Sequence, residues 1–235
     1  MASKTRLTAA VRSFDVAAVS AGLLESPELL THTDDRGRNW LHLTASINLP
    51  DHPELEAADS IELARRLLDL GLPINGAAFT EGTWAATPLW YAVARGRNLP
   101  LTRWLLEAGA TPEHCLWAAA FRDDEDMLGL LIEHGAPLEA VAEGETPLLG
   151  AIKVSRFRAA SLLLAAGADP NYVDASGMTA LHYLLKKGSA VEHLALLASH
   201  GARGDLPGPD GRTAVDILRR KRSAEFRALA DRLQS

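Results

Sequence analysis

The C-terminal half of the chain repeats itself at a fixed period. Thr146 and Thr179 are 33 residues apart, and Thr179 and Thr213 are 34 residues apart. A short apolar stretch follows each threonine, and glycines such as Gly167 and Gly201 end the stretches between them. Self-similarity at such a period is typical of proteins in which each small unit buries its apolar face against its neighbours. The period therefore predicts a repeat architecture.

The residues around these threonines resemble the ankyrin repeat. Residues 144–149 read Gly-Glu-Thr-Pro-Leu-Leu, residues 162–168 read Leu-Leu-Leu-Ala-Ala-Gly-Ala, and residues 177–182 read Gly-Met-Thr-Ala-Leu-His. In that family, Thr-Pro-Leu opens one helix and Leu-Leu-x-x-Gly-Ala closes the next. The resemblance implies an all-α fold, an ankyrin-repeat solenoid of stacked helix-turn-helix units with β-hairpin loops. We expect about five central repeats between N- and C-terminal caps.

The resemblance extends over residues 1–235, which we expect to form a single ankyrin-repeat domain. The caps are needed because a terminal repeat has one face without a neighbour. The expected parts are an N-terminal cap (1–33), a repeat with an insertion near 48–60 (34–80), a repeat (81–112), a degenerate repeat (113–140), two regular repeats (141–173 and 174–206) and a C-terminal cap (207–235). The insertion is either a surface loop, which costs little free energy, or a part of the binding side.

Two features of the family are carried by matching residues. Thr87 and Thr146 correspond to the threonine whose hydroxyl caps the inner helix, with proline at the first helical position. His42 and His182 correspond to the histidine whose imidazole ties one hairpin to the next. Gly37 is expected to supply a positive φ at a turn tip.

Composition restricts the possible classes of function. The formal net charge of −6 argues against a general nucleic-acid binder. Cys115 is the single cysteine, so no disulfide can form within the chain. No run of about 18 apolar residues occurs, and the first residues are too polar for a signal-peptide core. We expect a cytoplasmic monomer that does not enter a membrane.

The sequence lacks the residue patterns of an enzyme or a metal site. The eight histidines are scattered without ligand spacing, and Cys115 is expected to pack as a small apolar group. The acidic run at 123–126 lacks the alternating spacing of a calcium loop, so we expect a solvated loop with Asp124 or Glu125 at a helix start. We therefore predict no catalytic residue, no metal and no cofactor.

Aromatic residues are concentrated in residues 84–121. Trp90, Trp104 and Trp117 are expected in the core. Trp84 and Phe121 fall at positions that the family leaves exposed, where aromatic side chains serve as interface anchors. The alternative for both is local packing across a shortened hairpin.

The family's binding face consists of hairpin tips and inner-helix ends. Carried over position by position, the candidate partner-binding residues are Arg36, Arg38, Trp84, Arg95, Phe121, Lys153, Met178, Lys186, Lys187, Arg212, Arg220 and Lys221. Residues 176–235 carry a net charge of +4 and residues 1–175 a net charge of −10. Such asymmetry steers partners more than it adds affinity.

These observations lead to a non-enzymatic protein–protein interaction module. We expect it to bind one or more proteins on its concave face, as an adaptor, an inhibitor or an immunity-type protein. The partner would present an acidic segment and an apolar residue. The alternative is a regulatory domain that binds a small anionic ligand or nucleic acid through the basic C-terminal end, although those cations could also simply decorate a terminal helix.

Overall fold

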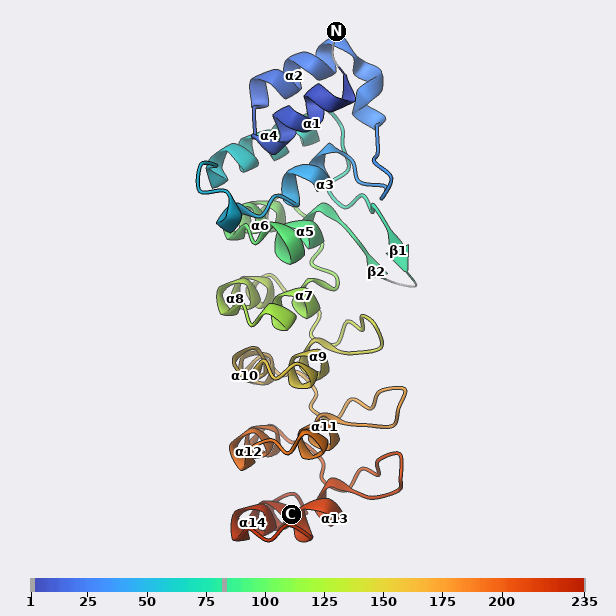
Figure 1. Ribbon diagram of the computed structural model, residues 1–235, viewed down its shortest axis with the longest axis vertical. Helices are drawn as coiled ribbons and strands as arrows, with labels where there is room; N and C mark the ends of the chain where they lie inside the picture. Colours follow the sequence, from blue (N-terminus) through green and yellow to red (C-terminus); the bar gives the residue numbers. More distant parts are fainter. Residues whose placement is uncertain (1–2, 82–83, 235) are drawn as a thin grey trace. The chain divides into compact units, whose positions relative to one another are not determined.

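The computed structural model describes residues 3–81 and 84–234, and these fold into two compact units. The N-terminal unit is Met1–Cys115 with Glu133–Ala136, and the C-terminal unit is Leu116–Ile132 with Pro137–Ser235. Each unit consists of helix pairs packed side by side (Figure 1).

The N-terminal unit combines helix pairs with a small β-hairpin. Strands β1 (Thr80–Glu81) and β2 (Trp84–Ala85) are antiparallel, with Thr80 opposite Ala85. The helices are α1 (Lys4–Arg12), α2 (Val16–Glu25), the 3-10 turns η1 (Pro27–Thr31) and η2 (Leu49–Asp51), α3 (Trp40–Ala45), α4 (Ala57–Asp69), α5 (Pro88–Tyr91), the π-helix η3 (Ala92–Gly96) and α6 (Leu99–Glu107).

The C-terminal unit is built from helix pairs whose connecting loops project to one side (Figure 1). Single β-bridges, Ala142 to Glu145 and Pro207 to Thr213, stand where regular hairpins would form. The helices are α7 (Cys115–Arg122, beginning at the unit boundary), α8 (Glu125–Glu133), α9 (Pro147–Lys153), α10 (Phe157–Ala165), α11 (Ala180–Lys187), α12 (Val191–Ser199), α13 (Ala214–Arg219) and α14 (Ala224–Arg232). The all-α fold expected from the resemblance is confirmed.

The predicted helix starts are confirmed by their capping bonds. The Thr87 hydroxyl accepts from the Trp90 N–H and the Thr146 hydroxyl from the Leu149 N–H, both at 3.2 Å. The Asp124 carboxylate accepts from the Met127 N–H at 3.2 Å. Each bond satisfies an N–H that a helix start leaves without a partner.

Leucines and alanines form both cores. In the N-terminal unit Leu41, Leu63 and Leu101 are completely buried, and in the C-terminal unit so are Leu128 and Leu163. Burial of each such side chain contributes about 1.5–3 kcal/mol relative to exposure. Since most of these residues lie between neighbouring helices, the packing of one pair on the next carries most of the stability.

The prediction that Trp90, Trp104 and Trp117 are core residues is wrong. All three are partly exposed, whereas Trp40 is the tryptophan with only 1% exposure, and its Nε1 donates to the Leu29 carbonyl at 2.7 Å. Trp117 lies against α9, where a Cβ added at Gly150 would come 2.9 Å from its Nε1. The ring covers this glycine and stays partly exposed.

The insertion near 48–60 is partly helical. It contains η2, and α4 begins at Ala57, inside the range expected for the insertion. The hydroxyl of Ser60 is buried and accepts from the Asn98 side-chain amide at 2.9 Å. The end of the insertion is therefore tied to the next repeat. Among the described residues, no helix has the length and apolarity needed to cross a membrane.

Candidate functional site

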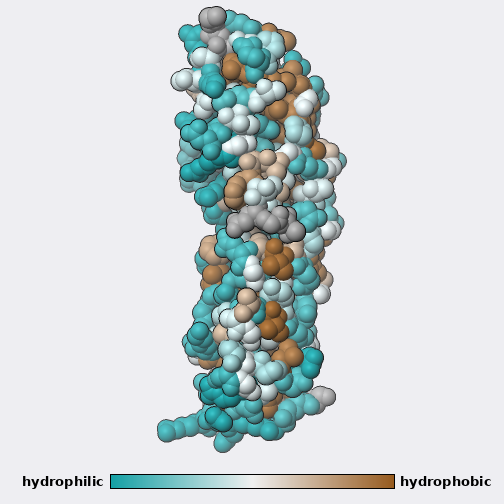
Figure 2. Space-filling view, turned by 90° about the vertical axis from the view of Figure 1, so that its right-hand side faces the viewer, coloured by the Kyte–Doolittle hydropathy of each residue, from teal (hydrophilic) through white to brown (hydrophobic). Residues whose placement is uncertain are grey.

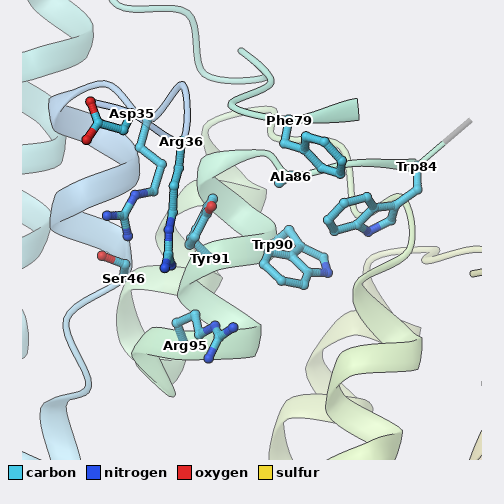
Figure 3. A pocket seen from close by; sticks show the side chains of 10 residues that line it. Asp35, Arg36, Ser46, Phe79, Trp84, Ala86, Trp90, Tyr91 and Arg95 are labelled. Carbon is cyan, nitrogen blue, oxygen red and sulfur yellow. The ribbon is translucent and has the colours of Figure 1, made fainter. Parts of the chain in front are cut away.

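The N-terminal unit contains a cavity of 580 Å³ between the turn at 34–38, the β-hairpin and the inner helix that follows it (Figure 3). Arginines and aromatic rings dominate its lining. The lining residues are Asp35, Arg36, Arg38, Ser46, Phe79, Trp84, Ala86, Trp90, Tyr91 and Arg95.

The first wall is an aspartate-anchored turn. One carboxylate oxygen of Asp34 accepts from the N–H groups of Arg36 and Arg38, both at 2.9 Å, and the other accepts from Arg38 Nε at 2.8 Å. Burial raises the pKa of Asp34, but these bonds from Arg38 and Arg36 outweigh it and hold that pKa below its ordinary value. Asp34 therefore stays ionised, and the turn has one fixed shape.

Gly37 joins this turn to the hairpin. Its φ is +74°, as the sequence predicts, and a Cβ added there would come 2.1 Å from the Ala78 carbonyl oxygen. The contact allows no side chain at position 37. It brings the arginines of the turn next to Phe79, which follows Ala78 directly.

The second wall is a row of aromatic rings. Phe79 and Trp84 meet edge to face with centroids 5.7 Å apart, and Trp84 and Trp90 do so at 5.1 Å. Phe79 is 52% exposed, while Trp84 is half-buried. Trp84 was expected either to be an exposed interface anchor or to pack locally. It packs on its neighbouring rings and still faces the cavity (Figure 3).

The π-helix η3 positions Arg95 at the cavity. Gly96 lies so close to α3 that an added Cβ would come 2.2 Å from the Ala45 carbonyl oxygen, and Arg97 ends the turn with φ +47°. Arg95 is thereby held in the same lining as Ser46, the residue after Ala45. Single π-turns within helices are frequent at functional sites.

The arginines of the lining differ in whether an ion pair neutralises their charge. Arg38 is neutralised by Asp34 at 2.7 Å, and its guanidinium lies 5.8 Å from the Tyr91 ring centroid. Arg36 and Arg95 have no ion-pair partner within residues 3–81 and 84–234. Asp35 is the one carboxylate among the described residues of the lining (Figure 3). Two uncompensated guanidinium groups therefore lie beside the aromatic wall.

The structure brings together four of the residues expected to bind a partner: Arg36, Arg38, Trp84 and Arg95. Phe79 was missed, and Trp90 was assigned to the core. The signal for Phe79 was its place at the start of a hairpin with Trp84 on the returning strand, a pairing that aromatic residues favour.

Several expected residues of the C-terminal unit have partners of their own. Lys153 pairs with Glu145, and this bond raises the pKa of Lys153. Lys187 Nζ donates to the Lys153 carbonyl at 2.6 Å, and Arg212 pairs with Asp210. Lys221 lies 5.9 Å from the Phe226 ring centroid, and the exposed Arg220 interacts electrostatically with Asp216. Lys186 is exposed without a partner in the described part of the chain.

Two further expected residues differ in exposure. Phe121 is 44% exposed and stacks on Trp117 with centroids 5.4 Å apart. Met178 is only 8% exposed, so the exposed hairpin position expected for it is not found. Its backbone N–H donates to the Asp174 carboxylate at 3.0 Å, and its apolar side chain packs into the core.

The hairpin side of the C-terminal unit presents separate apolar spots. Val141 and Val173, each in a loop between helix pairs, are 39% and 47% exposed. Figure 2 shows apolar spots on this side divided by hydrophilic surface. Scattered exposed apolar residues are ordinary on a protein surface and do not by themselves mark a binding site.

Arginines and aromatic rings dominate the lining, which also carries the hydroxyl groups of Ser46 and Tyr91. No cluster of three or more His, Cys, Asp or Glu residues suited to a metal occurs in the described residues. Cys115 lies elsewhere, and its complete burial raises the pKa of its thiol. The lining combines flat apolar surfaces with guanidinium donors, a composition suited to holding a side chain and an anion.

Comparison with protein-family models gives two overlapping matches. Residues 89–174 match the model described as ankyrin repeats (3 copies), and residues 151–198 match the one described as ankyrin repeats (many copies). Inversin of Homo sapiens is 33% identical over 127 residues, which are 53% of this chain and 12% of inversin. The chain thus spans a small part of this relative's length.

Solved structures show the same fold over most of the chain. An ankyrin repeat domain from Acinetobacter baumannii AYE has a TM-score of 0.65 and 25% identity, covering 83% of this chain and 97% of that one. The ankyrin repeat domain of Bcl-3 has a TM-score of 0.72 and 23% identity, covering 100% of each chain.

Proposed function

This chain is a member of the ankyrin-repeat family, whose repeats are protein–protein interaction modules, and on that premise we propose that it binds a protein partner through the cavity of the N-terminal unit. In this proposal a segment of the partner enters between the turn at 34–38 and the β-hairpin, with the protein acting as a non-enzymatic adaptor or inhibitor.

One observation carries the proposal. Four aromatic side chains and two arginines without ion-pair partners in the described residues line one cavity, at hairpin and inner-helix positions. Tryptophan, tyrosine and arginine are the residues most enriched among binding hot spots. A volume of 580 Å³ lies within the range of about 300–1,000 Å³ typical of ligand pockets.

The basic C-terminal end has weaker support as a site for an anionic ligand or nucleic acid. Lys153, Lys187 and Arg212 already have partners within their own unit. A ligand there would have to displace those contacts, whereas Arg36 and Arg95 have none to lose.

The test is affinity capture from a lysate of the source cells. The bait would be the wild type, Trp84→Ala or Arg95→Glu, with Leu24→Ala and Arg103→Glu as matched controls on exposed positions outside the cavity. We expect a stoichiometric protein with the wild type and both controls, and its loss with both cavity variants. Equal recovery by all baits, with circular dichroism confirming that each is folded, would refute a site in this cavity.

A further inference from the structure

We propose that the cavity recognises an acidic segment in which a carboxylate side chain lies close in sequence to a planar apolar side chain. This inference rests on the proposed function and adds the chemistry of the partner. It assigns Arg36 and Arg95 to the carboxylate and the Phe79–Trp84–Trp90 row to the planar group.

Arg36 and Arg95 are assigned to the carboxylate because of the way in which the structure holds them. The backbone N–H of Arg36 is fixed by Asp34, and Arg95 is fixed by the close approach of Gly96 to Ala45. Their guanidinium groups remain exposed without an ion-pair partner in the described chain. A guanidinium group binds a carboxylate with two parallel hydrogen bonds. Because the backbone of each arginine is already fixed, less conformational entropy is lost on binding.

Arg38 has a different role in this proposal. Its charge is already neutralised by Asp34, and its side chain is mostly buried, with 22% exposed. It therefore shapes the wall between Tyr91 and the turn, and the partner's carboxylate is left to Arg36 and Arg95.

The aromatic row is assigned to a planar side chain because its rings pack edge to face. Interplanar angles of 63° between Phe79 and Trp84 and 82° between Trp84 and Trp90 set neighbouring rings nearly at right angles. A flat side chain that enters meets the face of one ring and the edge of the next, which are the two favourable aromatic contacts. Phe79, 52% exposed, has the most area to bury.

A protein segment fits this site better than a nucleic acid. The whole chain carries a net charge of −6, and Asp35 lies in the lining itself. A polyanion would be repelled by these charges, whereas one carboxylate beside an apolar group gains from the arginines at short range.

The experiment is selection from a displayed library of random peptides against the full-length protein. The baits are the wild type, the double variant Arg36→Glu/Arg95→Glu, Trp84→Ala and the control Arg103→Glu. We expect the wild type and the control to enrich peptides with Asp or Glu near Trp, Tyr or Phe. The double variant should enrich Lys or Arg in place of the acidic residue.

The best enriched peptide is then synthesised with three matched versions: Asn or Gln for the acid, Ala for the planar residue, and phosphoserine for the acid. The amide and alanine versions should each bind at least about tenfold more weakly by calorimetry. The original peptide should bind the double variant with a similar loss, and its affinity should fall with added salt.

The outcomes separate the two proposals. Binding lost in Trp84→Ala but unchanged in the double variant overturns the acidic chemistry and keeps the cavity as the site. Binding unchanged in both refutes the site itself. A phosphoserine peptide that binds about tenfold tighter than the carboxylate peptide overturns the carboxylate assignment. If the selection enriches no peptide but the wild type still captures a partner that Trp84→Ala loses, recognition of a short segment is overturned.

Discussion

The Nε2 atom of His42 lies 2.9 Å from the carbonyl oxygen of Gly76, which follows it by 34 residues. The other ring nitrogen, Nδ1, accepts from the Asn39 N–H at 3.3 Å. The ring therefore joins the start of α3 to the beginning of the next hairpin. His182 makes the same link, from the Thr179 N–H at 3.2 Å to the Arg212 carbonyl at 3.4 Å. The tie predicted from the resemblance is confirmed at both positions.

Mild acid should destabilise the protein through His42. Burial lowers the pKa of His42 from 6.5 to about 4, so the folded protein keeps the ring neutral where the unfolded chain takes up a proton. Stability is therefore lost as the pH falls from 6.5 towards 4, by up to roughly 3 kcal/mol. The measurement is urea unfolding across this pH range.

The matched variant is His42→Gln, which cannot titrate. Its unfolding free energy should be lower at neutral pH, since the fit of the ring is lost, but should depend less on pH between 6.5 and about 4. Parallel pH curves for both proteins would show that His42 is not the group that titrates.

Gly96→Ala should displace η3, the π-helix that holds Arg95 in the lining of the cavity. The added methyl group would come 2.2 Å from the Ala45 carbonyl oxygen, so η3 must move away from α3. We expect a loss of about 1–3 kcal/mol, as for overpacking, together with loss of the captured partner. Thermal and urea unfolding measure the first effect.

Gly129→Ala is the control for a glycine-to-alanine change in a helix. Gly129 lies within α8, and nothing lies within 4 Å of an added Cβ. This variant should be more stable than the wild type by about 0.5–1 kcal/mol and should capture the partner normally. Destabilisation by both changes to the same extent would contradict the special role of Gly96.

Neighbouring lysines in α11 should behave differently. Lys187 Nζ donates to the Lys153 carbonyl and, at 2.8 Å, to the hydroxyl of Ser155, whose φ is +62°. Lys187→Ala should cost about 0.5–1.5 kcal/mol, because the turn loses a charged donor. Lys186→Ala, at an exposed position without a partner in the described chain, should leave the urea midpoint unchanged. Equal effects would rule out the bonds of Lys187 as a source of stability.

Asp123 should matter more for stability than Asp126, which lies in the same acidic run. Its carboxylate accepts from the Ala159 N–H at 2.8 Å and so caps α10 of the following repeat. Asp123→Ala should lower the unfolding free energy by about 1 kcal/mol, and Asp123→Asn should lower it less, since Asn also caps. Asp126→Ala, on an exposed position, is the comparison. A cost at Asp126 as large as at Asp123 would contradict the cap.

The sequence predicts those features that depend on local chemistry. Thr87, Asp124 and Gly37 occupy their expected roles, because a capping hydroxyl, a capping carboxylate and a positive φ are set by the residue and its neighbours. Arg97 and Ser155 could not be predicted in the same way. Both have positive φ between paired helices, and neither residue type favours that conformation, so tertiary packing imposes it.

Much of the candidate site depends on packing across sequence distance. Arg36 and Trp84 were expected at exposed positions, but nothing in their spacing shows that Gly37 meets Ala78 or that Gly96 meets Ala45. The core position predicted for Trp90 was wrong for a similar reason. Its ring packs edge to face on Trp84, six residues earlier, and lines the cavity.

The two glycine contacts have a consequence for how this protein can diverge. Positions 37 and 96 leave no space for any side chain, so almost every inherited change there is expected to be removed by selection. Positions 36 and 95 carry exposed side chains on this frame, whereas Trp84 packs on two of its rings. If the proposed function is right, descendants of this protein are expected to exchange one partner for another mainly through changes at positions 36 and 95.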